Sequence, residues 1–342
     1  MTLCTFASDN TSGVHPNILQ ALERVNVGAA KPYGDDPWTA EAEAAFRTLF
    51  GDDIDVFLVM LGTGANTLGL RAMTRPWQAI LCSESAHTHT TESGAVEAQI
   101  GCKMLPLPTV NGKIRAADIL GPLQDLGSAH HSQPRVLALT QATEVATLYS
   151  LEELREICDV AHKNGLLVHM DGARIANATA ALGGDVRALT RDVGVDMLSF
   201  GGTKNGMLCG EAVVIFNHAL AQDFLTQRKQ CLQLHSKMRF LAAQFLAYFD
   251  NDLWLDNARH ANAMAARLAG HLSTMSHVRL AHPVQTNGVF AILKPHHIAA
   301  LQQKYYFYEV DSVNHAVRWM LSYNTSPEQV DQFAQDIAAL AL

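Results

Sequence analysis

The sequence lacks the features of a membrane protein or a general nucleic-acid-binding protein. Its 342 residues contain no uninterrupted apolar run of about 18 residues, the length that a transmembrane helix needs. There is no basic run, and the formal net charge of −8 disfavours nucleic acid and anionic membranes as partners. The opening MTLCTFASDNTSG has no cationic segment followed by an apolar stretch, so we expect no signal peptide and a cytoplasmic location.

Paired cysteines and metal-ligand spacings are also missing. The six cysteines are scattered without a CxxC motif, mostly in apolar surroundings (Cys4, Cys82, Cys102, Cys158, Cys209 and Cys231). We interpret them as reduced core residues. The 16 histidines show no ligand spacing, and the pair in HTH at 87–89 has a separation that rarely chelates on regular structure. No metal site is expected.

What the chain has in quantity is apolar sequence in short runs. Apolar residues make up 48% of the chain and charged residues 17%, enough for a large core, and the length suits two domains. Between about 56 and 217, apolar runs alternate with helix-like stretches: VFLVML (56–61), AILCSES (79–85), KMLPLP (103–108), RVLALT (135–140), LLVHMD (166–171), DMLSF (196–200) and AVVIF (212–216). This pattern predicts an α/β fold with a mostly parallel sheet covered by helices on both faces.

Helix signals are clearest between the fourth and fifth runs. The segment SLEELREICDVAHKNG (150–165) opens with Ser150 and Glu153 in a capping-box pattern and closes at Gly165. Beyond about residue 240, the sequence predicts one long helix or two in succession.

The end of the chain has a different texture, which predicts a second domain. Strands are expected at 288–293 and 316–323, with a last helix from about Ser326. We therefore predict a large domain at 1–245, which includes the N-terminal segment, and a smaller α+β domain at 246–342.

Polar clusters follow five of the apolar runs. They are GTGANT (62–67), AHTHTTES (86–93), QATE (141–144), DGAR (171–174) and GGTKNG (201–206). Ligands of parallel sheets bind beyond the carboxyl ends of the strands. Five such clusters at successive strand ends therefore indicate one site.

The residue types in these clusters suit pyridoxal phosphate. That cofactor needs a lysine amine for its aldehyde, an acid against its ring nitrogen and a cradle for its phosphate. Lys204, Asp171 and GTGANT at a helix start supply one each. Each also has an ordinary interpretation, as a turn lysine, a helix cap and a tight turn. Their order along the chain favours the cofactor.

The sequence also resembles a known family. FASDNTSGVHP, YGDDP (33–37), GTGAN (62–66), HMDGARIANA (169–178) and the segment around Lys204 are similar to the low-specificity L-threonine aldolases, which are fold type I pyridoxal-phosphate enzymes of the β-eliminating lyase superfamily. The resemblance covers nearly the whole chain. It implies that fold, that cofactor, and a dimer or dimer of dimers (a homotetramer) with shared active sites.

The resemblance implies a role for individual residues. Lys204 matches the lysine that binds the cofactor aldehyde. The other matches to the cofactor site are Asp171 at the ring nitrogen, Gly62, Thr63, Gly64 and Asn66 in the phosphate loop, His87 stacked on the ring, and Arg174 and Arg239 near the cofactor. The matches to the substrate site are Ser8, Arg174 and Arg318 on the amino-acid carboxylate, and Tyr33 from across a dimer interface. Arg318 as a surface residue and Tyr33 as a turn aromatic remain alternatives.

One segment departs from the family pattern. Many members have ENTHN after the corresponding strand, with a histidine suited to the substrate β-hydroxyl. This chain has QATEV after RVLALT, which places Glu144 there. A carboxylate can accept that proton if burial raises its pKa. Lys204, His87 and Glu144 are therefore the candidate catalytic residues.

The expected activity is retro-aldol cleavage of L-β-hydroxy-α-amino acids, of the threonine, allo-threonine and phenylserine type, to glycine and an aldehyde. A β-eliminating lyase on the same scaffold would share the cofactor residues, so these do not separate the two reactions. A non-catalytic pyridoxal-phosphate-binding protein is a third alternative. Storage alone needs no carboxylate clamp, so Arg174 and Arg318 disfavour it.

Overall fold

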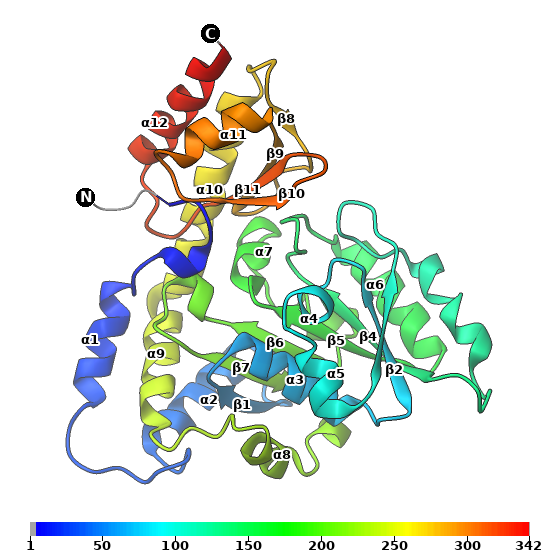
Figure 1. Ribbon diagram of the computed structural model, residues 1–342. Helices are drawn as coiled ribbons and strands as arrows, with labels where there is room; N and C mark the ends of the chain where they lie inside the picture. Colours follow the sequence, from blue (N-terminus) through cyan, green and yellow to red (C-terminus); the bar gives the residue numbers. More distant parts are fainter. Residues whose placement is uncertain (1–4, 342) are drawn as a thin grey trace.

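A computed structural model describes residues 5–341 and contains two β-sheets (Figure 1). Cys4, one of the six cysteines expected in the core, lies outside these residues. The other five are free, and Cys82, Cys102 and Cys158 are buried as expected. No helix in this part of the chain is long and apolar enough to cross a membrane.

The larger sheet has seven strands in the order β1-β7-β6-β5-β4-β2-β3. Their bounds are β1 Asp55–Val59, β2 Gln78–Ser83, β3 Lys103–Leu107, β4 Gln133–Thr140, β5 Leu167–Gly172, β6 Met197–Gly201 and β7 Glu211–Ile215. All seven correspond to the apolar runs, so the α/β prediction is confirmed. Five neighbouring strands run parallel, namely β6, β5, β4, β2 and β3. Strand β7 is antiparallel to both β6 and β1. The β6–β7 connection, residues 202–210, is too short for a crossover of a dozen residues, so β7 must turn back.

Twelve α-helices belong to the described residues. They are α1 Pro16–Val25, α2 Pro37–Phe50, α3 Gly62–Met73, α4 His87–Thr90, α5 Ala95–Ile100, α6 Leu151–Lys163, α7 Ile175–Ala181, α8 Phe224–Gln230, α9 Arg239–Phe249, α10 Leu253–Leu272, α11 Pro295–Gln302 and α12 Pro327–Ala338. The predicted capping box at Ser150 is present, since its hydroxyl accepts from Glu153 N while the Glu153 carboxylate accepts from Ser150 N. The predicted last helix also begins with a capping box, at Ser326.

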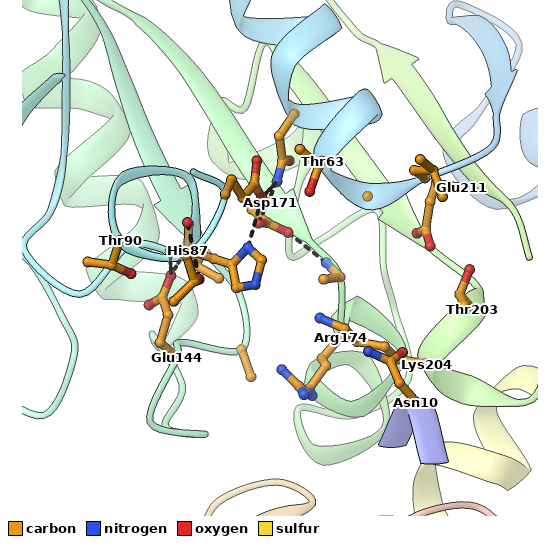
Figure 2. Close-up of a pocket in the computed structure, with 18 of the residues that line it drawn as sticks. Asn10, Thr63, His87, Thr90, Glu144, Asp171, Arg174, Thr203, Lys204 and Glu211 are labelled. Atoms are coloured by element: carbon orange, nitrogen blue, oxygen red, sulfur yellow. Dashed lines mark hydrogen bonds and ion pairs between the residues drawn. The ribbon is translucent and has the colours of Figure 1, made fainter. Parts of the chain in front are cut away.

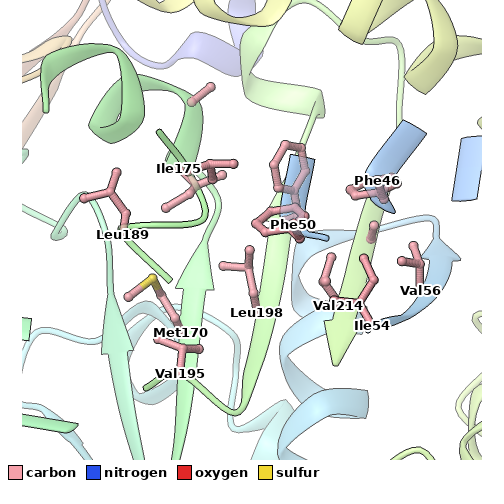
Figure 3. Close-up of a cluster of buried hydrophobic side chains, with 14 of the residues drawn as sticks. Phe46, Phe50, Ile54, Val56, Met170, Ile175, Leu189, Val195, Leu198 and Val214 are labelled. Carbon is pink, nitrogen blue, oxygen red and sulfur yellow. The ribbon is translucent and has the colours of Figure 1, made fainter. Parts of the chain in front are cut away.

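Both faces of the larger sheet are covered, because alternate residues of its strands face opposite cores. On one face, Leu198 and Val214 pack with Phe46 of α2 in the core that also contains residues of α1, α6 and α9 (Figure 3). On the other face, their neighbours Met197 and Val213 pack with residues of α3, α5 and α8. Because helices cover both faces, a ligand site of this sheet is expected at the ends of its strands.

The stretch after residue 240 forms two helices, one of the two predicted arrangements. Asn251 and Asp252 adopt positive φ values of 50° and 56° and break the helix between α9 and α10. The first half of α10, with Trp254, packs in the core of the larger sheet, and its second half, with Leu268, packs in a separate core. Helix α10 therefore joins the two parts of the molecule.

The second core belongs to a four-stranded antiparallel sheet in the order β10-β11-β9-β8. Its strands are β8 Arg279–Leu280, β9 Gly288–Ile292, β10 Tyr308–Asp311 and β11 Ala316–Met320. Phe6, from the N-terminal segment, is buried in this core and stacks on Phe333 of α12, with ring centroids 4.4 Å apart. The start of the chain thus packs on the smaller sheet, and the predicted boundary near residue 245 stays a prediction.

Candidate active site

A cavity of about 520 Å³ lies where the carboxyl ends of the parallel strands meet the smaller sheet (Figure 2). Nine of the predicted site residues line it: Gly62, Thr63, Asn66, His87, Glu144, Asp171, Arg174, Lys204 and Arg318. All but Arg318 come from the larger sheet and its connections. Each of the five strand-end clusters therefore contributes to the lining of one cavity.

Asp171 is buried at the end of β5, and its carboxylate is fixed from two sides. Its Oδ2 accepts from Asn66 Nδ2 at 2.8 Å, and its Oδ1 accepts from Ala173 N at 2.9 Å. Both bonds fix the orientation of the carboxylate. Asp171 can therefore hold a protonated ring nitrogen in the cavity.

The start of α3 faces the cavity with backbone N–H groups. Its first helical hydrogen bond runs from Ala65 N to Leu61 O, so the amides of residues 62–64 precede the regular pattern. With the positive end of the helix dipole, such amides suit a phosphate. Gly64 does not line the cavity. A Cβ on it would lie 2.3 Å from the Gln233 side chain, so its glycine is explained by close packing.

His87 is oriented by a buried carboxylate. Its Nδ1 lies 2.8 Å from Glu92 Oε1, which also accepts from Asn66 Nδ2 at 3.2 Å. Asn66 thereby connects the histidine to Asp171. Glu92 thus orients the His87 ring through Nδ1.

Glu144 lies beside His87 and has one free oxygen. Its Oε1 accepts from Thr140 Oγ1 at 2.7 Å and from His87 N at 3.1 Å, whereas its Oε2 is buried without a hydrogen-bond partner. Burial raises the pKa of Glu144 despite the two donors. This is a carboxylate that can take up a proton from a ligand.

Lys204 lies in the short helix η5 (Thr203–Asn205) within the β6–β7 connection. Burial and the nearby charge of Arg174 lower its pKa, and the carboxylates of Asp9, Asp171 and Glu211 oppose this only in part. A lowered pKa makes the free amine available, as Schiff-base chemistry requires.

The two arginines of the site differ in their partners. Arg174 Nε and Nη2 donate to the two oxygens of Asp9 at 2.8 and 2.6 Å. Arg318, on β11, donates from Nη2 to the Ala7 carbonyl at 3.0 Å, but its buried Nε has no partner. Arg318 therefore has donors left for a ligand carboxylate.

Besides Gly64, three predicted site residues lie away from the cavity. The Ser8 hydroxyl accepts from Asn10 N as the cap of the short helix η1 (Asp9–Thr11). Arg239 donates to the carbonyls of Val27 and Gly28. Tyr33 has a positive φ and a 46% exposed side chain.

Sequence reasoning missed two buried carboxyl groups, Asp9 and Glu211. Asp9 follows Ser8 directly, and the signal that could have identified it was a lone acid in a segment already assigned to the site. Glu211 begins β7, where an acid at the start of an apolar run is unusual. Among residues 5–341, no three His, Cys, Asp or Glu side chains gather as metal ligands.

Comparisons with known proteins agree with this geometry. The family model described as β-eliminating lyase matches residues 5–295. A low-specificity L-threonine aldolase of Pseudomonas aeruginosa is 44% identical over 97% of this chain and 96% of its own, and one of Pseudomonas sp. is 41% identical over 98% and 97%. A solved structure of Leishmania major threonine aldolase has a TM-score of 0.94 and 31% identity, covering 99% of this chain and 100% of its own. The chain belongs to the β-eliminating lyase family and, within it, to the low-specificity L-threonine aldolases, which are fold type I pyridoxal-phosphate enzymes.

Proposed function

We propose that this protein cleaves L-β-hydroxy-α-amino acids, such as threonine, allo-threonine and phenylserine, to glycine and an aldehyde. The observation that carries the proposal is one cavity that contains Lys204, Asp171 and the partly unpartnered Arg318. Pyridoxal phosphate, when bound, supplies the electron sink for the pair released from the Cα–Cβ bond. The chain's own residues must bind the substrate, orient it and move the proton of its β-hydroxyl.

The donor set of the cavity fits this cofactor. Lys204 offers a buried amine with a lowered pKa, Asp171 an anchored carboxylate, and the start of α3 free amides for a dianion. The side chains of Thr63 and Lys204 point into the same space (Figure 2).

Arg318 is the residue that we assign to the substrate carboxylate. Its buried Nε lacks a partner, and a carboxylate at that position satisfies it with a strong charge-assisted bond. Fixing the carboxylate restricts rotation about the bonds of Cα and so selects which bond breaks. Arg174 lines the same cavity and stays paired with Asp9, so it adds positive charge without binding the carboxylate directly.

Glu144 is the residue that we assign to the β-hydroxyl proton. Oε1 is held by Thr140 and by the His87 amide, so the free Oε2 has a fixed position at the cavity. Because burial raises its pKa, the carboxyl holds a proton more readily than a surface glutamate does. The imidazole of His87, fixed by Glu92, is left to stack on the cofactor ring.

We further assign a homo-oligomer, a dimer or dimer of dimers, with active sites shared between subunits, and a cytoplasmic location. The Tyr33 side chain is half exposed, and Lys229 Nζ lies 4.8 Å from its ring centroid. Leu232, three residues after Lys229, is 88% exposed. Exposed apolar side chains of this kind suit a subunit interface. In that arrangement Tyr33 completes the partner's site. The free cysteines suit a reducing compartment.

The test of the activity is product analysis with L-threonine, L-allo-threonine and L-phenylserine. Wild-type protein should release aldehyde and glycine in equal amounts. Lys204→Ala should lose both turnover and the cofactor's visible absorbance band, and Lys163→Ala, on the exposed surface of α6, should keep both. Ammonia and a 2-oxo acid without glycine would instead indicate a β-eliminating lyase, and a band without turnover a non-catalytic cofactor-binding protein.

The assignment of the base is tested by Glu144→Gln. This change keeps the side-chain shape and removes the proton acceptor, so kcat should fall about 10²- to 10⁴-fold while the visible band persists. A variant with unchanged kcat would move the proton transfer to another group.

A further inference from the structure

Glu211 is a buried carboxyl group at the cavity that the proposed reaction does not use. It is the first residue of β7 and lies opposite Gly201, the last residue of β6. Its side chain is buried, lines the cavity and faces Thr203 (Figure 2). One of its oxygens accepts from Gly202 N at 3.2 Å, and the Thr203 hydroxyl is a further hydrogen-bond partner. Both partners directly precede Lys204.

The other two carboxylates near Lys204 are held by partners outside the turn that carries Lys204. Asp9 is held by both donors of Arg174 and by Asn287 Nδ2. Asp171 is held by Asn66 and by a backbone amide. Of the three, Glu211 is the carboxyl group whose donors, Gly202 N and the Thr203 hydroxyl, belong to the turn that carries Lys204.

We propose that Glu211 is a positioning residue for Lys204. Its carboxyl group holds the turn at 202–203, and its negative charge, when present, favours the protonated state of the nitrogen at the end of the Lys204 side chain. The inference rests on the proposed function in one respect, that Lys204 is the residue that binds the cofactor.

The electrostatics of the cavity agree with this geometry. Burial raises the pKa of Glu211 to about 7, although the Thr203 hydroxyl and the charge of Lys204 oppose the rise. The charged groups that face Lys204 are Arg174, which disfavours its ammonium form, and Asp9, Asp171 and Glu211, which favour it. Despite burial, Arg174 lowers the pKa of Asp9, whereas the pKa of Glu211 is about 7, so Glu211 supplies a contribution that varies around neutral pH.

The experiment is a pH titration of the visible absorbance of the holoenzyme, which reports the proton on the nitrogen that joins Lys204 to the cofactor. In Glu211→Gln, the carboxamide keeps an oxygen for Gly202 N and removes the charge. The midpoint of the absorbance change should move to lower pH by about one unit. The control Glu156→Gln, on the exposed face of α6, should leave the midpoint unchanged.

A second variant tests the same contact without changing the carboxyl group. Thr203→Val removes the hydroxyl that favours the charged form of Glu211, so the midpoint should move in the same direction by a smaller amount. Thr203→Val also keeps the role of Glu211 testable if the Glu211→Gln variant does not fold.

The results that contradict the inference are separable from those that contradict the proposed function. A normal visible band in Glu211→Gln with an unshifted midpoint would overturn the role of Glu211. A wild-type band in Lys204→Ala would instead remove Lys204 as the cofactor residue, and both proposals with it.

Discussion

Arg174 and Arg318 meet the same cavity from two parts of the molecule, and their surroundings are opposite. Arg174 precedes α7 on the larger sheet and forms a bidentate pair with Asp9. Burial works against its charge, but the pair raises its pKa. Arg318 lies on β11 of the smaller sheet, where burial and the charge of Arg174 lower its pKa. One guanidinium is satisfied within the protein, and the other is not.

This difference separates two tasks that the sequence assigned jointly. A bidentate carboxylate partner leaves Arg174 little capacity for a second carboxylate. The Arg174–Asp9 pair also links the N-terminal segment to the larger sheet. That segment packs on the smaller sheet through Phe6. We therefore expect Arg174 to act mainly on structure and Arg318 mainly on substrate binding.

The largest expected effect is that of Arg318→Ala. Removing the partly unpartnered guanidinium should lower kcat/KM for L-threonine about 10²- to 10³-fold, chiefly through KM, because the substrate carboxylate loses a buried charged partner. The visible cofactor band should persist. Steady-state kinetics check this, with Arg279→Ala on the exposed side of β8 as the matched control. Equal losses in Arg318→Ala and the control would contradict the comparison.

Asp9→Asn addresses the other arginine and should act on stability. It leaves the Arg174 guanidinium buried with a neutral partner, so the free energy of unfolding should fall by about 2–3 kcal/mol. Urea unfolding of the two proteins measures the difference. KM should change less than in Arg318→Ala, and a larger rise in KM than in that variant would mean that Arg174 is the main carboxylate ligand.

The contrast between the arginines also shows where sequence reasoning stops. The apolar runs predicted the larger sheet, and the polar clusters at their ends predicted most of the residues that line the cavity. Both are local signals in the sequence. The partner of Arg174 lies 165 residues away, at Asp9, and no local pattern connects them. Glu211 was missed for a related reason, since β7 brings it to the cavity by turning back on β6. Local sequence predicts elements, whereas such pairs depend on how the elements meet.

The pH dependence of stability sharpens the assignment of Asp9. Burial alone would raise its pKa, but attraction to and hydrogen bonds from Arg174 lower it from 3.8 to about 2. A depressed pKa stabilises the fold above the unfolded-state value of 3.8, and this contribution is lost as the pH falls toward 2. It amounts to about 2 kcal/mol. The gap in unfolding free energy between wild type and Asp9→Asn should therefore be constant above pH 5 and narrow by pH 3. A gap independent of pH would contradict the ion pair.

The smallest expected effect concerns what holds Arg318 in place. Tyr308, opposite Arg318 in the β10–β11 register, has its ring centroid 5.6 Å from the guanidinium carbon. A cation over an aromatic face gains about 0.5–1 kcal/mol at such a site. Tyr308→Leu should therefore raise KM for L-threonine about 2- to 5-fold with kcat unchanged. Tyr308→Phe keeps the ring and should retain the wild-type KM. If the phenylalanine variant raised KM as much as the leucine variant, the hydroxyl rather than the ring face would be the part of Tyr308 that orients Arg318.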